Sequence, residues 1–230
     1  VGLIYDSAKQ IYRSHSTDSP ATGFVTHEAT NIAVEAAPVS PTGVIGQRLL
    51  DSRSRRSFLA LGVPGHRLYR ALRVLTSEYG AHPLDVTEIL LTELRSQAQA
   101  AGMKWTTVEA ADAAATGSRP AQGLATLVAR AVPAVTAAVE QAMDADGERP
   151  VLLTDAATLA RYGHLTVLTQ WTDLTRPRRQ AVWLVVPQLR GNQGPLLDGH
   201  PVTLNSPGQF VRLDSEWIDT RDRALDPSGA

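Results

Sequence analysis

The residues whose type and spacing best suit binding of a charged ligand are two clusters of arginines. Such clusters can hold phosphate groups, including those of a nucleic-acid backbone. A chain with 22 basic and 23 acidic residues also carries such clusters on an ordinary solvated surface, and this interpretation is favoured. The candidate contacts to nucleic acid or to a partner protein are Arg53, Arg55, Arg56, Arg176, Arg178 and Arg179.

Asp155 is the acidic residue whose position best suits chemistry. It follows the apolar segment VLLT, and α/β folds place their sites at the carboxyl ends of parallel strands. Arg161, early in the next predicted helix, belongs to the same candidate site. Thr154 or Asp155 could instead cap that helix, and the cap is the favoured interpretation.

The acidic residues also allow an enzyme hypothesis, a metal-dependent hydrolase or nuclease. It would use Asp112, Asp155 and Asp198, of which the first and last lie in predicted loops. Asp198 followed by glycine is also a common turn sequence. None of the three is paired with another group in the way that acid–base catalysis requires. No catalytic residue is therefore assigned.

The strong local motifs of nucleotide and hydrolase chemistry are missing from the sequence. It has no GxxxxGK[ST] phosphate loop, no HRD or DFG of a kinase, no GxSxG and no HExxH. The 6 histidines include no i, i+4 pair that would form a metal-binding face. The absence of cysteine excludes disulfides and thiolate ligands. The sequence therefore predicts no cofactor in this chain.

The composition is that of a soluble globular chain. Apolar residues make up 43% and charged residues 20%, and the net charge of −1 argues against a general nucleic-acid binder. No apolar run approaches the roughly 20 residues that span a bilayer, so we expect no membrane contact. The lack of cysteine fits a cytoplasmic location. The opening VGLIYDSAKQ is not a signal peptide, and we interpret the chain as part of a longer protein.

Strand and helix patterns alternate from residue 57 onward. Apolar runs predict strands at 57–63, 150–155 and 181–187, and the alternating segment MKWTTVE predicts another at 103–109. Helical spacing predicts helices at 66–79 and 85–102, one at 124–143 that Pro133 should kink or split, and one that ends near residue 174. LDGHPVTL, GQFVRL and EWI are closing strand candidates.

This order predicts an α/β fold with a mixed, mainly parallel sheet flanked by helices. VLLTD and AVWLVVP, joined by a helix, form a βαβ unit near the C-terminus, so their strands should be parallel. We divide the chain into an extended N-terminal arm or domain remnant at 1–47, the α/β domain at 48–219 and a disordered tail at 220–230.

Three phrases resemble one family of proteins. They are SFLALGV with the two helices after it, LATLVARAVPAV with VLLTDAATLARYGHL, and AVWLVVPQLRGNQGPLLDGHPVTL with the segment that follows to EWI. Together they resemble the C-terminal end of the PglW-type serine/threonine kinases of phage growth limitation and related BREX systems. The resemblance implies that kinase and ATPase portions lie elsewhere in the parent protein. It transfers no catalytic residue to this chain.

The leading hypothesis is a non-catalytic C-terminal accessory domain of a large antiviral protein, which binds other proteins of a defence complex or other domains of its parent. The first alternative is a DNA-binding module that uses the loops at Arg53–Arg56 and Arg176–Arg179. The second is the metal-dependent hydrolase or nuclease described above. They differ in whether DNA or a divalent metal is bound.

Overall fold

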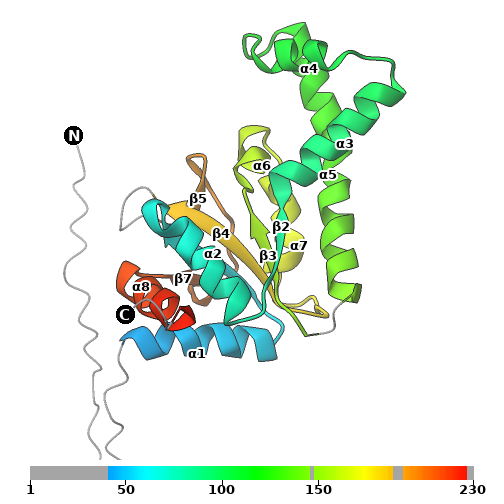
Figure 1. Ribbon diagram of the computed structural model, residues 1–230. Coiled ribbons are helices and arrows are strands. Elements are labelled where there is room, and N and C mark those ends of the chain that lie inside the picture. Colours follow the sequence, from blue (N-terminus) through cyan, green and yellow to red (C-terminus); the bar gives the residue numbers. More distant parts are fainter. Residues whose placement is uncertain (1–40, 146–147, 189–193, 227–230) are drawn as a thin grey trace, which may run out of the picture. The chain divides into compact units, whose positions relative to one another are not determined.

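The computed structural model describes residues 41–145, 148–188 and 194–226 (Figure 1). The predicted extended arm lies outside the described residues up to residue 40. Residues 41–47, which we had assigned to that arm, are the first turns of helix α1. Ile45 and Leu49 of this helix are buried, so apolar contacts with the domain hold it in place despite its glycines.

A five-stranded parallel sheet lies at the centre of the domain, in the order β2-β3-β4-β1-β7. The predicted mixed α/β fold with a mainly parallel sheet is confirmed, as is the parallel βαβ unit of β3 and β4. A short antiparallel hairpin of β5 and β6 accompanies the sheet. The strands are β1 (Phe58–Pro64), β2 (His82–Asp85), β3 (Val151–Thr154), β4 (Val182–Gln188), β5 (Leu196–Leu197), β6 (His200–Pro201) and β7 (Phe210–Arg212).

The central strands are apolar on both faces because helices cover both sides of the sheet. Alternate residues of one strand enter different cores: Phe58 of β1 packs in one cluster and Leu59 in the other. Trp183 of β4 is completely buried in the second cluster, where Tyr79 meets it edge to face. The sheet is therefore the shared wall of two hydrophobic cores.

Each face of the sheet has its own set of helices, which Figure 1 shows. Buried residues of three helices fill one core: α1 (Pro41–Ser54), α2 (Leu68–Ser77) and α8 (Ser215–Leu225). Five others line the opposite core: α3 (Val86–Ala100), α4 (Trp105–Asp112), α5 (Arg119–Ala145), α6 (Ala157–Arg161) and α7 (Thr169–Thr172). Single 3-10 turns are η1 (Gly65–Arg67), η2 (Leu165–Leu168) and η3 (Pro207–Gln209).

Two predicted strands are helices, for identifiable reasons. The strand at 103–109 is wrong, since α4 covers most of it: Trp105 and Val108 reach the core three residues apart, which is helical spacing. EWI is also wrong as a strand. Asp214 caps α8 there by accepting a hydrogen bond from the Trp217 N–H at 2.6 Å, and the adjacent Trp217 and Ile218 are both fully buried.

Two long predicted helices also differ from the structure. The helix expected to reach residue 174 is broken into α6, η2 and α7, and Gly163, with φ of 75°, provides the break. Conversely, α5 continues through Pro133 as one helix of 27 residues. Its buried side chains recur every three or four residues and fill the core, which sustains the helix despite the lost backbone bond.

By length and composition α5 could cross a membrane, and it is the one helix among the described residues that meets this test. The apolar run is interrupted by Arg130 and Glu140 on exposed positions. Val128, Val135 and Val139 are buried against the rest of the domain. The helix therefore serves here as a core element of the α/β domain.

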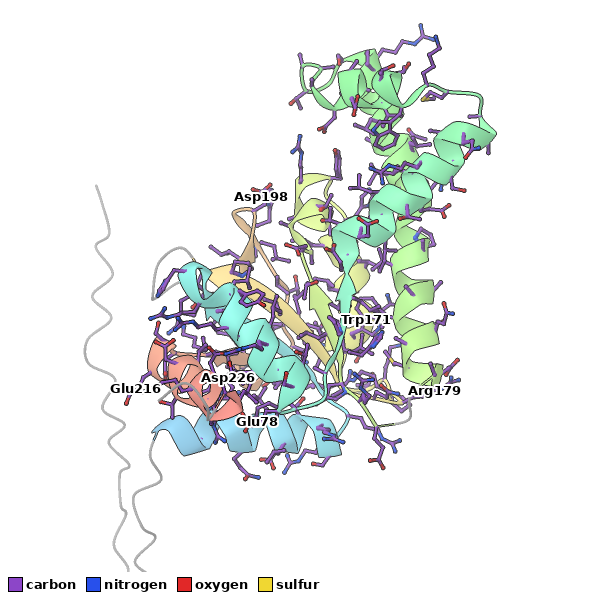
Figure 2. All side chains as sticks on the ribbon, in the orientation of Figure 1. Glu78, Trp171, Arg179, Asp198, Glu216 and Asp226 are labelled. Atoms are coloured by element: carbon purple, nitrogen blue, oxygen red, sulfur yellow. The ribbon has the colours of Figure 1, made fainter. Side chains whose placement is uncertain are left out.

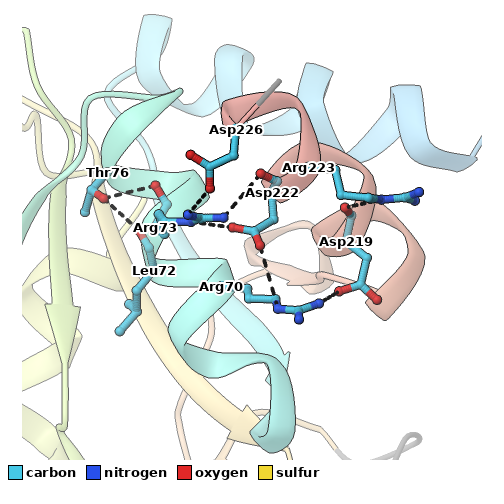
Figure 3. Close-up of polar contacts among 8 residues, drawn as sticks. All are labelled: Arg70, Leu72, Arg73, Thr76, Asp219, Asp222, Arg223 and Asp226. Atoms are coloured by element: carbon cyan, nitrogen blue, oxygen red, sulfur yellow. Dashed lines mark hydrogen bonds and ion pairs between the residues drawn. The ribbon is translucent and has the colours of Figure 1, made fainter. Parts of the chain in front are cut away.

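Ion pairs fasten the last helix, α8, to α2 (Figure 3). Arg70 contacts Asp219 at 2.8 Å, and Arg73 contacts Asp222 at 2.6 Å and Asp226 at 2.5 Å. The Asp222 side chain is only 10% exposed, so its pairing matters for the fold. The tail that we had predicted from residue 220 is thus helical and attached as far as residue 225.

Candidate functional site

The two arginine clusters lie side by side at the amino-terminal edge of the sheet. Arg53 lies in the last turn of α1 and Arg56 in the turn before β1, while Arg176 to Arg179 lie in the loop before β4. Strands β1 and β4 are parallel neighbours that start in register, with Phe58 opposite Val182. The segments that precede them must therefore meet at one edge, although more than a hundred residues separate them in the sequence.

Two cavities open on this surface, and we call them together the arginine groove. The larger, of about 320 Å³, has Met143, Trp171 and Pro177 among its lining residues, with Glu140, Asp144, Gln170, Arg176, Arg178 and Arg179 around them. The smaller, of about 190 Å³, is lined by Arg53, Ser54, Arg56, Glu148, Arg179, Gln180 and Ala181. Arg179 lines both cavities. Figure 2 shows Trp171 and Arg179 in this part of the domain.

Arg178 holds the arginine groove together. Its guanidinium donates hydrogen bonds to the main-chain oxygens of Arg56 at 2.9 Å, Trp171 at 2.6 Å and Asp173 at 2.9 Å. Partial burial lowers the pKa of Arg178 from its ordinary value, while nearby Asp173 acts in the opposite direction. Because Arg178 links the turn before β1 to the end of α7, it is a positioning residue and not a free ligand contact.

The other arginines of the groove are more exposed. Arg53 donates to the main-chain oxygen of Glu148 at 3.2 Å and lies 4.0 Å from its carboxylate, and Arg179 pairs with Asp144. These pairs are solvent-exposed and therefore weak. The side chains of Arg56 and Arg176, and of Arg55 just outside the two cavities, form no ion pair within the described part of the chain. They remain available to an anionic ligand.

Asp155 lies at the carboxyl end of β3, as predicted, but it does not cap the helix. Ala156 is the N-cap of α6, and no side chain accepts a hydrogen bond there, so the cap prediction is wrong. Asp155 adopts a left-handed backbone with φ of 48°. Desolvation, followed by the charge of Asp85 on the adjacent β2, raises the pKa of Asp155 above its ordinary value.

Arg161 and Asp112 are brought together, and they form a structural tie between α6 and α4. Arg161 Nη2 lies 2.9 Å and 3.0 Å from the two carboxylate oxygens of Asp112, and the Tyr162 hydroxyl donates to the first at 2.6 Å. Burial, together with the Asp112 hydrogen bond, raises the pKa of Tyr162 to about 12. The Asp112 carboxylate is thus already occupied by protein donors.

Asp198 lies apart from the arginine groove, in the turn between β5 and β6 with φ of 47° (Figure 2). Within residues 41–145, 148–188 and 194–226 no group of three or more His, Asp or Glu side chains could hold a metal ion. The structure therefore does not assemble Asp112, Asp155 and Asp198 into the metal site that the hydrolase hypothesis needs.

Comparison with known proteins gives one curated relative. The chain is 32% identical over 183 residues to "Probable kinase PglW" of Streptomyces coelicolor (strain ATCC BAA-471 / A3(2) / M145). The chain is related to PglW. This similarity to PglW covers 77% of the chain and confirms the predicted resemblance. The chain spans only 12% of the length of PglW. No family model and no solved structure matches the chain.

Sequence reasoning found the arginines but missed the residues that make their surface concave. Trp171 was predicted to be a core residue and is 4% exposed, yet it also lines the larger cavity. Met143 and Asp144, at the end of α5, were not singled out at all. No local motif marks these positions, because they reach the groove only through the packing of α5 and α7 on the sheet.

Proposed function

We propose that this chain is a non-catalytic binding module of a phage-defence protein related to PglW. The observation that carries the proposal is the assembly of two distant arginine clusters on one concave surface. The candidate acidic residues, by contrast, are dispersed, and Asp112 is bound to Arg161 and Tyr162. Kinase activity, which the name of PglW suggests, then belongs to other parts of such a protein.

The test is an assay of the purified chain with ATP and Mg²⁺. We expect no release of ADP and no transfer of phosphate to the chain or to a general kinase substrate. The matched control is Asp155→Asn, which removes the best-placed carboxylate at the carboxyl edge of the sheet. ATP turnover that Asp155→Asn abolishes would overturn the non-catalytic proposal.

Nucleic acid is the second element of the proposal, as the ligand of the arginine groove. Arginine side chains neutralise phosphates, and phosphate contacts contribute most of the sequence-independent affinity of proteins for DNA. The arginine groove offers Arg56 and Arg176 without ion pairs among the described residues, and an exposed Arg179. A local surface of this kind can act even though the net charge of the whole chain is only −1.

Fluorescence anisotropy with labelled DNA, measured at several salt concentrations, tests this second element. Arg56→Gln with Arg176→Gln should weaken binding several-fold and reduce the salt slope by about one to two. The control is Arg119→Gln with Arg130→Gln, two exposed arginines on α5 whose change alters net charge equally. Equal weakening by both pairs would contradict a role for the groove.

The adjacent Arg178 and Arg179 would be the obvious pair to replace in such a test, but the structure argues against it. Arg178 binds three main-chain oxygens. Its replacement would disturb the fold of the groove and confuse lost contacts with lost structure. Arg56 and Arg176 avoid this difficulty because both are exposed.

A further inference from the structure

The two cavities of the arginine groove differ in chemistry and share a wall. The smaller presents the guanidinium groups of Arg53, Arg56 and Arg179, which are donors suited to phosphate oxygens; the Ser54 hydroxyl already donates to the main-chain oxygen of Asp51 at 3.0 Å. Only Glu148 contributes a carboxylate there, and its side chain is 90% exposed. This cavity of about 190 Å³ therefore suits an anionic group such as a phosphate.

The larger cavity suits a planar group with amino substituents. Pro177, with the small exposed parts of Met143 and Trp171, provides apolar surface for the face of a ring, and Arg176, Arg178 and Arg179 also line the cavity. Glu140 and Asp144 add carboxylates, which accept hydrogen bonds from exocyclic amino groups such as that of cytosine. An unstacked base needs apolar surface for the faces of its ring and hydrogen-bond acceptors for its amino group.

We propose that the arginine groove binds an unstacked nucleotide of single-stranded DNA, with its phosphate in the smaller cavity and its base in the larger one. This inference rests on the proposed nucleic-acid binding and specifies the form of the ligand. In a duplex the bases are stacked and paired, so a base can enter such a cavity only after it is extruded. In a single strand the bases are unpaired, so a base can enter the cavity without being extruded from a duplex.

Arg179 is the residue that joins the two halves of the site. It lines both cavities and now pairs with Asp144, with side-chain exposures of 73% and 56%. Ion pairs between exposed side chains contribute little and exchange readily. Arg179 can therefore turn from Asp144 to a phosphate, which also frees the Asp144 carboxylate for an amino group of the base.

The experiment compares labelled 12-mers of dC and dT with a mixed-sequence duplex of equal length, using the full chain. We expect dC to bind at least tenfold more tightly than the duplex, and more tightly than dT, which lacks an exocyclic amino group. Arg56→Gln with Arg179→Gln should weaken dC binding tenfold or more. Arg119→Gln with Arg130→Gln should change it less than twofold, since Arg119 lies roughly 30 Å along α5 from Glu140.

A second variant tests the base cavity without touching the arginines. Glu140→Ala with Asp144→Ala, which removes both acceptors, should abolish the preference for dC over dT while single-strand binding persists. Duplex binding equal to or tighter than single-strand binding would overturn this inference and leave the nucleic-acid proposal intact. If no DNA of either form binds, the nucleic-acid proposal itself fails. Thermal melting of each variant confirms that it is folded.

Discussion

Replacement of Arg178 by alanine should destabilise the whole domain, although the residue is part of an apparent ligand surface. The variant loses three hydrogen bonds of 2.6 to 2.9 Å, which run to main-chain oxygens of Arg56, Trp171 and Asp173. A hydrogen bond to a charged group contributes about 1.5 to 3 kcal/mol. Because the three share one partly exposed guanidinium, and water replaces part of them, we expect a loss of about 2 to 4 kcal/mol.

Urea denaturation followed by tryptophan fluorescence measures this change, because Trp171 and Trp183 are both buried. A loss of this size is a large part of the roughly 5 to 15 kcal/mol that stabilises a domain. Arg176→Ala is the matched control, since Arg176 is exposed in the same loop and should cost less than about 0.5 kcal/mol. If both variants unfold at the parent's urea concentration, Arg178 does not organise the groove and the reasoning is refuted.

Three further changes test the packing and charges of the fold. Trp217→Ala should cost about 3 to 5 kcal/mol in urea unfolding, because this side chain of α8 is fully buried in the core; a cost below 1 kcal/mol would show that α8 is detached. Asp222→Asn should lower the melting temperature by several degrees, and a cycle with Arg73→Gln should show that the effects are coupled; additive effects would contradict the pairing. Asp155→Asn should stabilise the fold at pH 7. The raised pKa of Asp155 means that its charged form destabilises the fold above the ordinary value of 3.8, so the gain should vanish at lower pH; a gain independent of pH would contradict this.

The central strands could be predicted because their own residues indicate buried strands. Runs such as FLALGV and VWLVV are apolar on both faces, and no other element of this length explains them. The edge strand β2 was missed because HPLD is only half-buried, contains proline and overlaps the cap of α3 at Asp85. Its pairing with β3 supplies the stability that its own sequence lacks.

The α8 segment shows why two adjacent apolar residues are a poor basis for predicting a strand. Trp217 and Ile218 are neighbours and both fully buried, which suggests a strand buried on two faces. The cap at Asp214 and the spacing of Asp219 and Asp222 belong to a helix, but the partners of these two aspartates are arginines on α2, 149 residues earlier. The pairing that settles the assignment is therefore tertiary and could not be inferred locally.

The two edges of the sheet, at the amino and carboxyl ends of its strands, differ as candidate binding sites. A general rule for parallel sheets directs attention to the carboxyl edge, where Asp155 lies. There desolvation, followed by the charge of Asp85, raises the pKa of Asp155, while Arg161 is engaged by Asp112. At the opposite edge the register of β1 against β4 brings two arginine clusters together.

The register of β1 against β4 positions the arginine groove, and this affects how the groove binds a ligand. The groove is fixed before any ligand arrives, because Arg178 already holds both loops through main-chain oxygens. Little ordering entropy then opposes association, which favours affinity from few contacts. The Arg178→Lys variant gives a further test. The single ammonium group of lysine cannot reach all three oxygens. Ligand binding should therefore weaken even where Arg55, Arg56 and Arg176 are intact. Undiminished binding by a folded Arg178→Lys protein would show that the arginines act individually and that their arrangement is unimportant.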